Sequence, residues 1–133
     1  MREEIDGVPM LSEHMPIYVA EWGGGRLVLE SEFTDKHLNR AGIVHGGLIA
    51  ALLDIGIAAG AYADAEEPRD WYGMTVTMTV NFVQAVGPGA VTCKSGPTGG
   101  GKRTRHVEAQ LLDKAGALVA SASGVAKIIE RPK

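Results

Sequence analysis

The feature that most constrains this chain is one long apolar stretch, residues 48–63. It has no proline and consists mostly of leucine, alanine and isoleucine, so it predicts a helix of about four turns. Most of the remaining sequence alternates apolar and polar residues, as half-buried strands do. We therefore expect an α+β fold in which a single long helix packs on one curved antiparallel sheet.

Strand patterns lie on both sides of this helix. The run RLVLESEF alternates, so that Leu27, Leu29 and Ser31 share one face. Residues 113–116 have a turn composition between two long β runs and predict a hairpin. The glycine-rich residues 96–101 predict a bend or bulge. Strands are expected at residues 14–21 (a short strand or the floor of a pocket), 26–33, 74–83, 90–95, 104–113 and 117–129.

Composition restricts the class of protein. With 133 residues and 45% hydrophobic content, the chain should form a single domain, 1–133, with residues 1–14 loosely ordered or a short docking segment. A net charge of −3 does not favour nucleic-acid binding. The single cysteine, Cys93, excludes an intrachain disulfide and offers no metal cluster. No run is long enough to span a membrane, so we expect a cytoplasmic enzyme or binding module.

Asp54 is the one charge within the apolar helix. A helix with small apolar residues on all sides is usually buried, and a lone buried carboxylate is costly unless it is paired or used. Two interpretations are open. Asp54 is either a buried residue held by neighbouring polar groups or a catalytic carboxylate facing a cleft.

The start of the helix favours the cleft. Gly46 and Gly47 lack Cβ atoms, so a ligand can approach the free N–H groups and the positive end of the helix dipole, as in an oxyanion hole. The alternative is a tight turn that needs glycine. His45 is a candidate ligand contact, or simply a helix cap or a hydrogen-bonded core histidine.

Asn39, His45-Gly46-Gly47 and Asp54, nine positions after the histidine, together resemble the hotdog-fold acyl-CoA thioesterases of the phenylacetate-pathway type. The resemblance extends over about residues 22–129. It implies a hotdog fold, a dimer or tetramer, and hydrolysis of an acyl-CoA thioester without a metal or other cofactor.

The resemblance also implies roles for individual residues. Asn39 would help to position the nucleophile or substrate, and His45 would hydrogen-bond near the thioester. Thr75 would orient the water beside Asp54, although an ordinary strand threonine is the alternative. Asp54 would act as general base or as nucleophile, and the sequence does not choose between them.

Helix geometry suggests that the site is shared between two chains. Gly47 and Asp54 are seven residues apart, or about 10 Å along the axis, so the short Asp54 side chain cannot reach the Gly47 N–H of its own helix. Two chains related by a two-fold axis can bring these groups together. The Gly47 amide would hold the developing oxyanion, and Asp54 would come from the partner.

The phosphates of a coenzyme A substrate need cations. Lys102, Arg103 and Arg105 lie in a glycine-rich setting. Strand alternation would place Arg103 and Arg105 on one face and Lys102 on the other, so at least one is a solvated charge.

The acyl pocket and the exact activity stay open. Possible lining residues are Met15, Leu53, Trp71, Tyr72 and Met74. One alternative function is an acyl-thioester hydratase or dehydratase, which would need a histidine against an acid. The other is a non-catalytic acyl-CoA binding module, which would gain little from a buried carboxylate.

Overall fold

The fold of the chain was analysed in a computed structural model that describes residues 2–5 and 8–133. The elements in chain order are α1 (Pro9–His14), β1 (Tyr18–Gly23), β2 (Arg26–Phe33), a 3-10 turn η1 (Asp35–His37), α2 (Gly46–Gly60), a second 3-10 turn η2 (Pro68–Asp70), β3 (Trp71–Phe82), β4 (Gly89–Gly100), β5 (Thr104–Asp113) and β6 (Leu118–Glu130).

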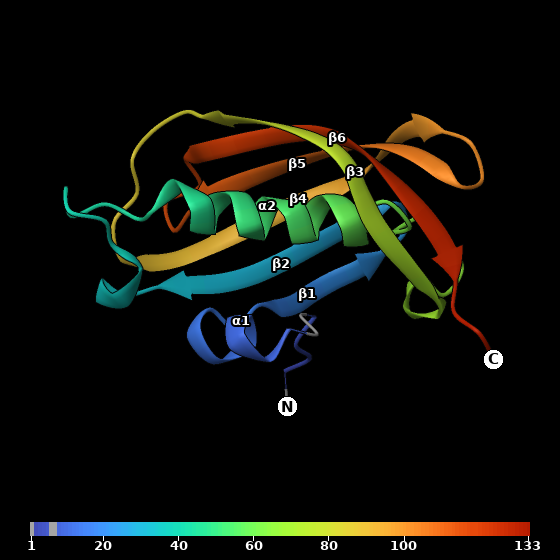
Figure 1. Cartoon of the computed structure of the whole chain (residues 1–133), viewed down its shortest axis with the longest axis horizontal. Helices are drawn as coiled ribbons and strands as arrows, with labels where there is room; N and C mark the ends of the chain where they lie inside the picture. The colour runs from blue at the N-terminus through green and yellow to red at the C-terminus, as the bar shows by residue number, and fades with distance from the viewer. Residues whose placement is uncertain (1, 6–7) are drawn as a thin grey trace.

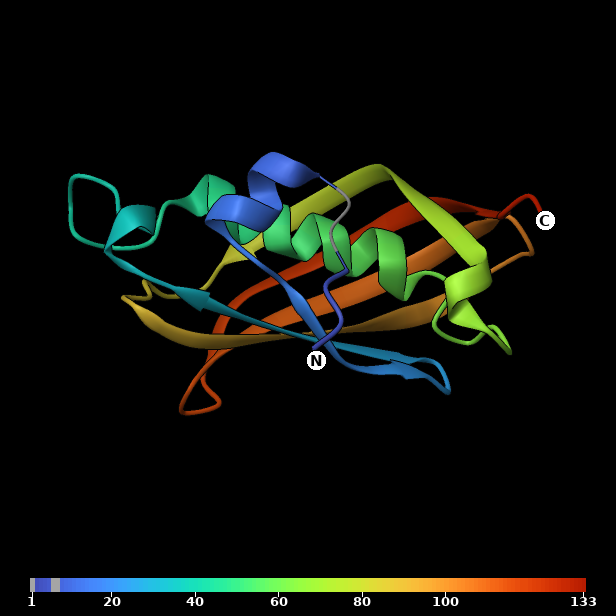
Figure 2. The same cartoon turned by 90° about the horizontal axis from the view of Figure 1, so that it is seen from below.

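The six strands form one antiparallel sheet in the order β1-β2-β4-β5-β6-β3. Helix α2 lies along the inner face of this curved sheet, and β3 crosses beside its C-terminal half (Figure 1). The view from below shows the strands curving beneath the helix (Figure 2). This arrangement is the hotdog fold, which confirms the expected fold class.

Glycines bring α2 unusually close to the sheet. A Cβ on Gly56 would lie 2.8 Å from the Cys93 sulfur, and one on Gly60 would overlap the Ser95 hydroxyl. That hydroxyl donates a hydrogen bond of 2.8 Å to the Gly56 carbonyl. On the other side, a Cβ on Gly73 of β3 would overlap the Ala58 carbonyl oxygen. Helix α2 therefore packs so closely against both β4 and β3 that no side chain fits at these three glycines.

Element boundaries differ from the sequence expectations in several places. Helix α2 starts two residues before Leu48, because His45 caps it, and it ends at Gly60, three residues before the expected end. The Ala63 carbonyl beyond it accepts a hydrogen bond from the Gly25 amide in the β1–β2 turn. Strand β4 continues through residues 96–100, and the expected bulge lies within it, between Pro97 and Gly99. The expected hairpin of β5 and β6 is confirmed.

Strand β3 contains a second bulge. Its register against β6 shifts between Thr75 and Thr77, so Val76 is the extra residue. Before the bulge, Gly73 and Thr75 are the less exposed residues, whereas after it they are Met78 and Val80. The bulge thus switches which residues face the helix, and a single strict alternation does not describe the strand.

The N-terminal segment is packed on the sheet. The segment expected to be loosely ordered contains α1, and Glu4 forms an isolated bridge with Tyr18. The Val19 amide donates to the Glu3 carbonyl, and the Ile5 amide donates to the Ile17 carbonyl. These residues cover part of the β1 edge of the sheet. No helix in the part of the chain that the structure describes is long and apolar enough to cross a membrane.

Replacing Gly73 by alanine should destabilise the fold, because the new methyl group would overlap the Ala58 carbonyl of α2. Overpacking of this kind costs about 1–3 kcal/mol, which thermal or urea unfolding would measure. The matched control is Gly87→Ala, since a Cβ there meets nothing within 4 Å. Equal stability of the two variants would contradict the close approach of β3 to α2.

Candidate active site at the start of α2

Helix α2 is capped by the histidine that precedes it. His45 has extended backbone angles, and its Nδ1 accepts a hydrogen bond of 2.9 Å from the Gly47 N–H. A Cβ on Gly47 would lie only 3.1 Å from the same Nδ1, so glycine makes room for the imidazole. The Gly47 amide, expected to bind the oxyanion, is therefore already used within the chain.

The amide that is free belongs to Gly46. Its N–H has no hydrogen-bond partner within residues 2–5 and 8–133, and it lies at the positive end of a 15-residue helix. A Cβ on Gly46 would lie 3.3 Å from Cε1 of the Phe82 ring. Sequence reasoning missed Phe82, because a phenylalanine that ends a strand looks like an ordinary core residue.

Asn39 organises the loop that leads to the helix. Its Oδ1 accepts hydrogen bonds from the Ala41 amide at 2.9 Å and the Ile43 amide at 3.3 Å. Gly42 follows with a φ of 79°, which favours glycine. The side-chain carbonyl of Asn39 is thus committed to a local turn, and only its NH₂ group is available to a ligand.

Asp54 lies on the uncovered side of α2. It is exposed, so the expectation of a helix buried on all sides is wrong for the single chain. The sheet covers the face that carries Ile49, Leu52, Leu53, Gly56 and Ile57. Within the described residues, the Asp54 carboxylate has no hydrogen bond or ion pair. Of the two interpretations, the buried and locally satisfied carboxylate is excluded for the isolated chain.

Thr75 lies on the helix-facing side of β3, next to the bulge. Its Oγ1 is buried and has no hydrogen-bond partner among the residues that the structure describes. A buried hydroxyl without a partner is costly unless something else occupies it. Of the predicted site residues, Thr75 therefore has the clearest capacity for a further hydrogen bond.

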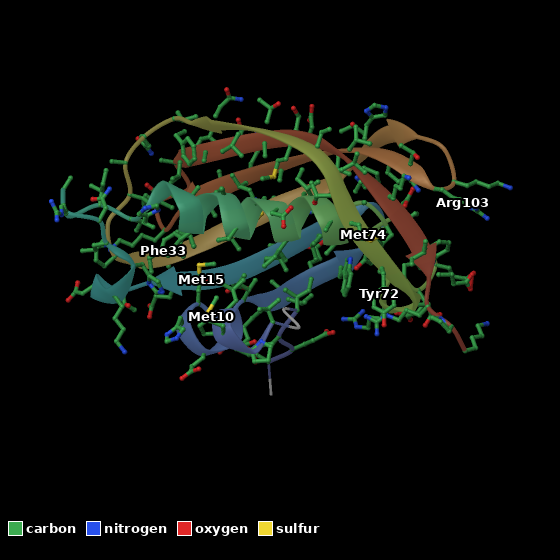
Figure 3. All side chains as sticks on the ribbon, in the orientation of Figure 1. Met10, Met15, Phe33, Tyr72, Met74 and Arg103 are labelled. Carbon is green, nitrogen blue, oxygen red and sulfur yellow. The ribbon has the colours of Figure 1, made fainter. Side chains whose placement is uncertain are left out.

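The predicted phosphate ligands lie near the opposite end of α2 from its capped N-terminus. Lys102 and Arg103 are exposed in the β4–β5 turn, where Arg103 points away from the body of the protein (Figure 3). Strand alternation does not govern Arg103, because β5 begins at Thr104. Arg105 is mostly buried and forms an ion pair with Asp64 at 2.5 Å. Of these three cations, Lys102 and Arg103 form no ion pair with any residue that the structure describes.

Other reactive groups contribute little to a site. Burial raises the pKa of the Cys93 thiol to about 12, so it is not a ready nucleophile. The described residues contain no group of three or more metal-ligating side chains. Met15 and Leu53, proposed as pocket residues, are fully buried in the core. Tyr72 and Met74 are exposed along β3 (Figure 3), and Trp71 is partly buried.

The structure thus brings together Asn39, His45, Gly46 and Gly47 at one helix end, and it separates Asp54 from them. Gly46 and Asp54 are eight residues apart, or about 12 Å along the axis. The free amide can stabilise negative charge on an oxygen, and the unpaired carboxylate can accept a proton or attack a carbonyl carbon. One chain alone cannot apply both groups to the same carbonyl.

Residues 41–123, more than half of the chain, match the family model described as the thioesterase superfamily. The chain belongs to this superfamily. A Saccharolobus solfataricus protein, SSO2140, whose name places it among the esterases, is 30% identical over 102 residues, which are 75% of this chain and 69% of that protein.

Solved structures show the same fold. The Escherichia coli PaaI protein from the phenylacetic acid degradation operon has a TM-score of 0.74 at 22% identity, over 86% of this chain and 80% of that one. The smu.793 protein of Streptococcus mutans, solved with acetyl-CoA bound, has a TM-score of 0.72 at 19% identity, over 86% of this chain and 90% of that one.

Replacing His45 by alanine should destabilise α2, because the Gly47 amide loses its acceptor. Loss of an N-cap typically costs about 1 kcal/mol, and asparagine is a good capping residue, so His45→Asn should retain most of the stability. Thermal unfolding of both variants measures the difference. If alanine and asparagine were equally destabilising, capping would not be the role of the imidazole.

Proposed function

We propose that the protein is an acyl-CoA thioesterase of the phenylacetate-pathway type that acts in the cytoplasm as a two-fold dimer or a dimer of dimers. The observation that carries this proposal is the pair of unoccupied groups on α2, the free Gly46 amide at its start and the unpaired Asp54 carboxylate on its uncovered face. Membership of the thioesterase superfamily supports the reaction class. Binding of acetyl-CoA by a protein of the same fold supports the substrate class.

The open edge of β3 supports pairing between two chains. Tyr72, Met74 and Val76 are each about half exposed, at 46%, 53% and 53%. β3 is an edge strand of 12 residues, and an open, apolar edge of this length is a ready surface for strand pairing. Antiparallel pairing of two β3 strands about a two-fold axis would place the two α2 helices side by side and antiparallel.

Small residues on the uncovered side of α2 would permit that approach. Gly47, Ala50, Ala51, Asp54 and Ala58 are exposed or half-buried and follow a helical spacing. With the helices antiparallel, the start of one lies toward the middle of the other. Asp54 of each chain would then face the Gly46 amide of its partner. The dimer would thus bring together the two groups that lie too far apart within one chain. Lys102 and Arg103, beyond the end of one α2, would lie on the side where the partner's α2 begins.

In the proposed reaction the thioester carbonyl oxygen accepts a hydrogen bond from the Gly46 N–H, in place of the Gly47 N–H expected from the sequence. As general base, Asp54 takes a proton from water, and the hydroxide attacks the carbonyl carbon. As nucleophile, its carboxylate attacks directly and forms a mixed anhydride that water then hydrolyses. In both routes the carbon–sulfur bond breaks, and the thiolate leaves and gains a proton. Thr75 would orient the water or the carboxylate through its unpaired hydroxyl.

The alternative functions have less support. A hydratase or dehydratase needs a histidine against an acid, whereas the His45 Nδ1 accepts from its own helix. A binding module no longer conflicts with a buried carboxylate, since Asp54 is exposed in the single chain. A tight acyl-CoA complex without hydrolysis would favour that function.

Replacing Asp54 by asparagine should remove the base or nucleophile and lower kcat for acyl-CoA hydrolysis by about 10²–10⁴-fold. Free-thiol release from a panel of aryl, short-chain and long-chain acyl-CoAs measures this. The matched control is Glu108→Gln, an exposed carboxylate on β5, which should keep wild-type rates. Wild-type kinetics in Asp54→Asn would refute the assignment, and no hydrolysis by the wild type would favour the binding module.

Replacing Val76 by lysine should weaken the proposed dimer, because it places a charge at the open apolar edge of β3. Light scattering should show the mass moving from a multiple of the 14.0 kDa chain toward the single chain, and activity should fall with it. Gln110→Lys, exposed on the central strand β5, is the control and should change neither. A wild-type protein that is monomeric and active would contradict the shared site.

A further inference from the structure

The Phe82 ring lies against the first residue of α2. Phe82 ends β3 and is 58% exposed, although it is a large apolar side chain. The position that a Cβ of Gly46 would take is 3.3 Å from Cε1 of this ring and 3.5 Å from Cζ. Phe82 therefore occupies the side of Gly46 on which another residue would carry its own side chain.

A second ring lies on the next glycine. The His45 imidazole covers Gly47, where a Cβ would be 3.1 Å from Nδ1 and 3.3 Å from Cε1. Each glycine of this pair is thus packed by one ring, and the Gly46 N–H is the amide left without a partner. The Phe82 ring therefore lies beside the residue that carries the free amide.

We propose that Phe82 determines which acyl groups can be hydrolysed, because its ring is the wall against which the carbon next to the thioester carbonyl packs. This inference rests on the proposed function. An oxygen bound to the Gly46 N–H lies about 2.9 Å from the nitrogen, so the carbonyl carbon and its substituents would lie on the side of Gly46 where the ring packs. A straight chain can lie flat on the ring, whereas a branch at the first carbon would clash with it.

The surroundings of Phe82 favour contact with the acyl chain of the substrate over contact with its coenzyme A part. Phe82 is followed by Val83, which is 54% exposed, and the loop before α2 carries Ile43, which is 37% exposed. That loop is joined to the segment after β3 by a hydrogen bond of 2.9 Å from the Val44 amide to the Val86 carbonyl. Apolar surroundings favour a hydrocarbon chain over the amide-bearing arm of the coenzyme.

The test compares kcat/KM for butyryl-CoA and isobutyryl-CoA, which differ in branching at the first carbon and have the same number of atoms. Wild-type protein should prefer the straight chain by at least about tenfold, as a steric difference of one methyl group allows. Phe82→Leu and Phe82→Ala should reduce that preference several-fold by accelerating the branched substrate. Phe82→Tyr keeps the ring and should keep the preference.

Met10→Ala is the matched control, since it removes apolar surface from an exposed residue on α1, away from the start of α2, and should leave the preference unchanged. Light scattering on each variant separates loss of assembly from a change in selectivity, because dissociation would slow both substrates alike. Phe82→Leu retains an apolar side chain, so the substrate preference can be measured in this variant if Phe82→Ala does not fold.

An unchanged preference in an active Phe82→Leu variant, or no preference in active wild-type protein, would overturn this inference and leave the proposed function intact. If wild-type protein released no thiol from any acyl-CoA, the proposed function would fail and this inference with it. A loss of preference in Met10→Ala equal to that in Phe82→Ala would also overturn it, since the ring would then have no specific role.

Discussion

The close approach of α2 to the sheet is the constraint on which the rest of the structure depends. Gly60 meets Ser95 on β4, and Gly73 on β3 meets the backbone of Ala58. Two strands that are far apart in the sheet therefore contact the same helix, and this is possible only because the sheet is strongly curved. The curvature leaves one side of α2 uncovered, which is the side that carries Asp54. The exposed carboxylate is thus a consequence of how tightly the other sides are packed.

The same use of glycine explains the start of the helix. A Gly-Gly pair before an apolar run allows two general interpretations, a tight turn or a ligand site. Here each glycine has a particular neighbour, the Phe82 ring for Gly46 and the His45 imidazole for Gly47. By capping the helix, His45 occupies the Gly47 amide, and the Gly46 amide has no partner among the described residues. The packing of these four residues therefore leaves one amide available to a ligand, so the tight turn and the ligand site do not exclude each other.

The sequence was sufficient for the class of fold but not for the details of the site. Alternation in β2 and the apolar run of α2 predicted the layers correctly, since a half-buried strand alternates and a helix that packs against a sheet is apolar. The identity of the free amide could not be predicted, because it depends on the orientation of the His45 ring. The exposure of Asp54 depends on how far the sheet wraps around α2, which no local pattern encodes. Alternation predicts a strand position for Arg103, whereas it lies in the turn between β4, which ends at Gly100, and β5, which begins at Thr104.

The two edges of the sheet differ in a way that limits how chains can join. Backbone groups of Glu3 and Ile5 already bond to the β1 side, whereas β3 ends the sheet on the other side as its last strand. A sheet with two open edges can add neighbours indefinitely, as fibres do. A sheet with one protected edge can be extended only through the other, so strand addition to such a sheet cannot continue beyond a pair. The described part of the N-terminal segment thus protects the β1 edge against open-ended strand addition.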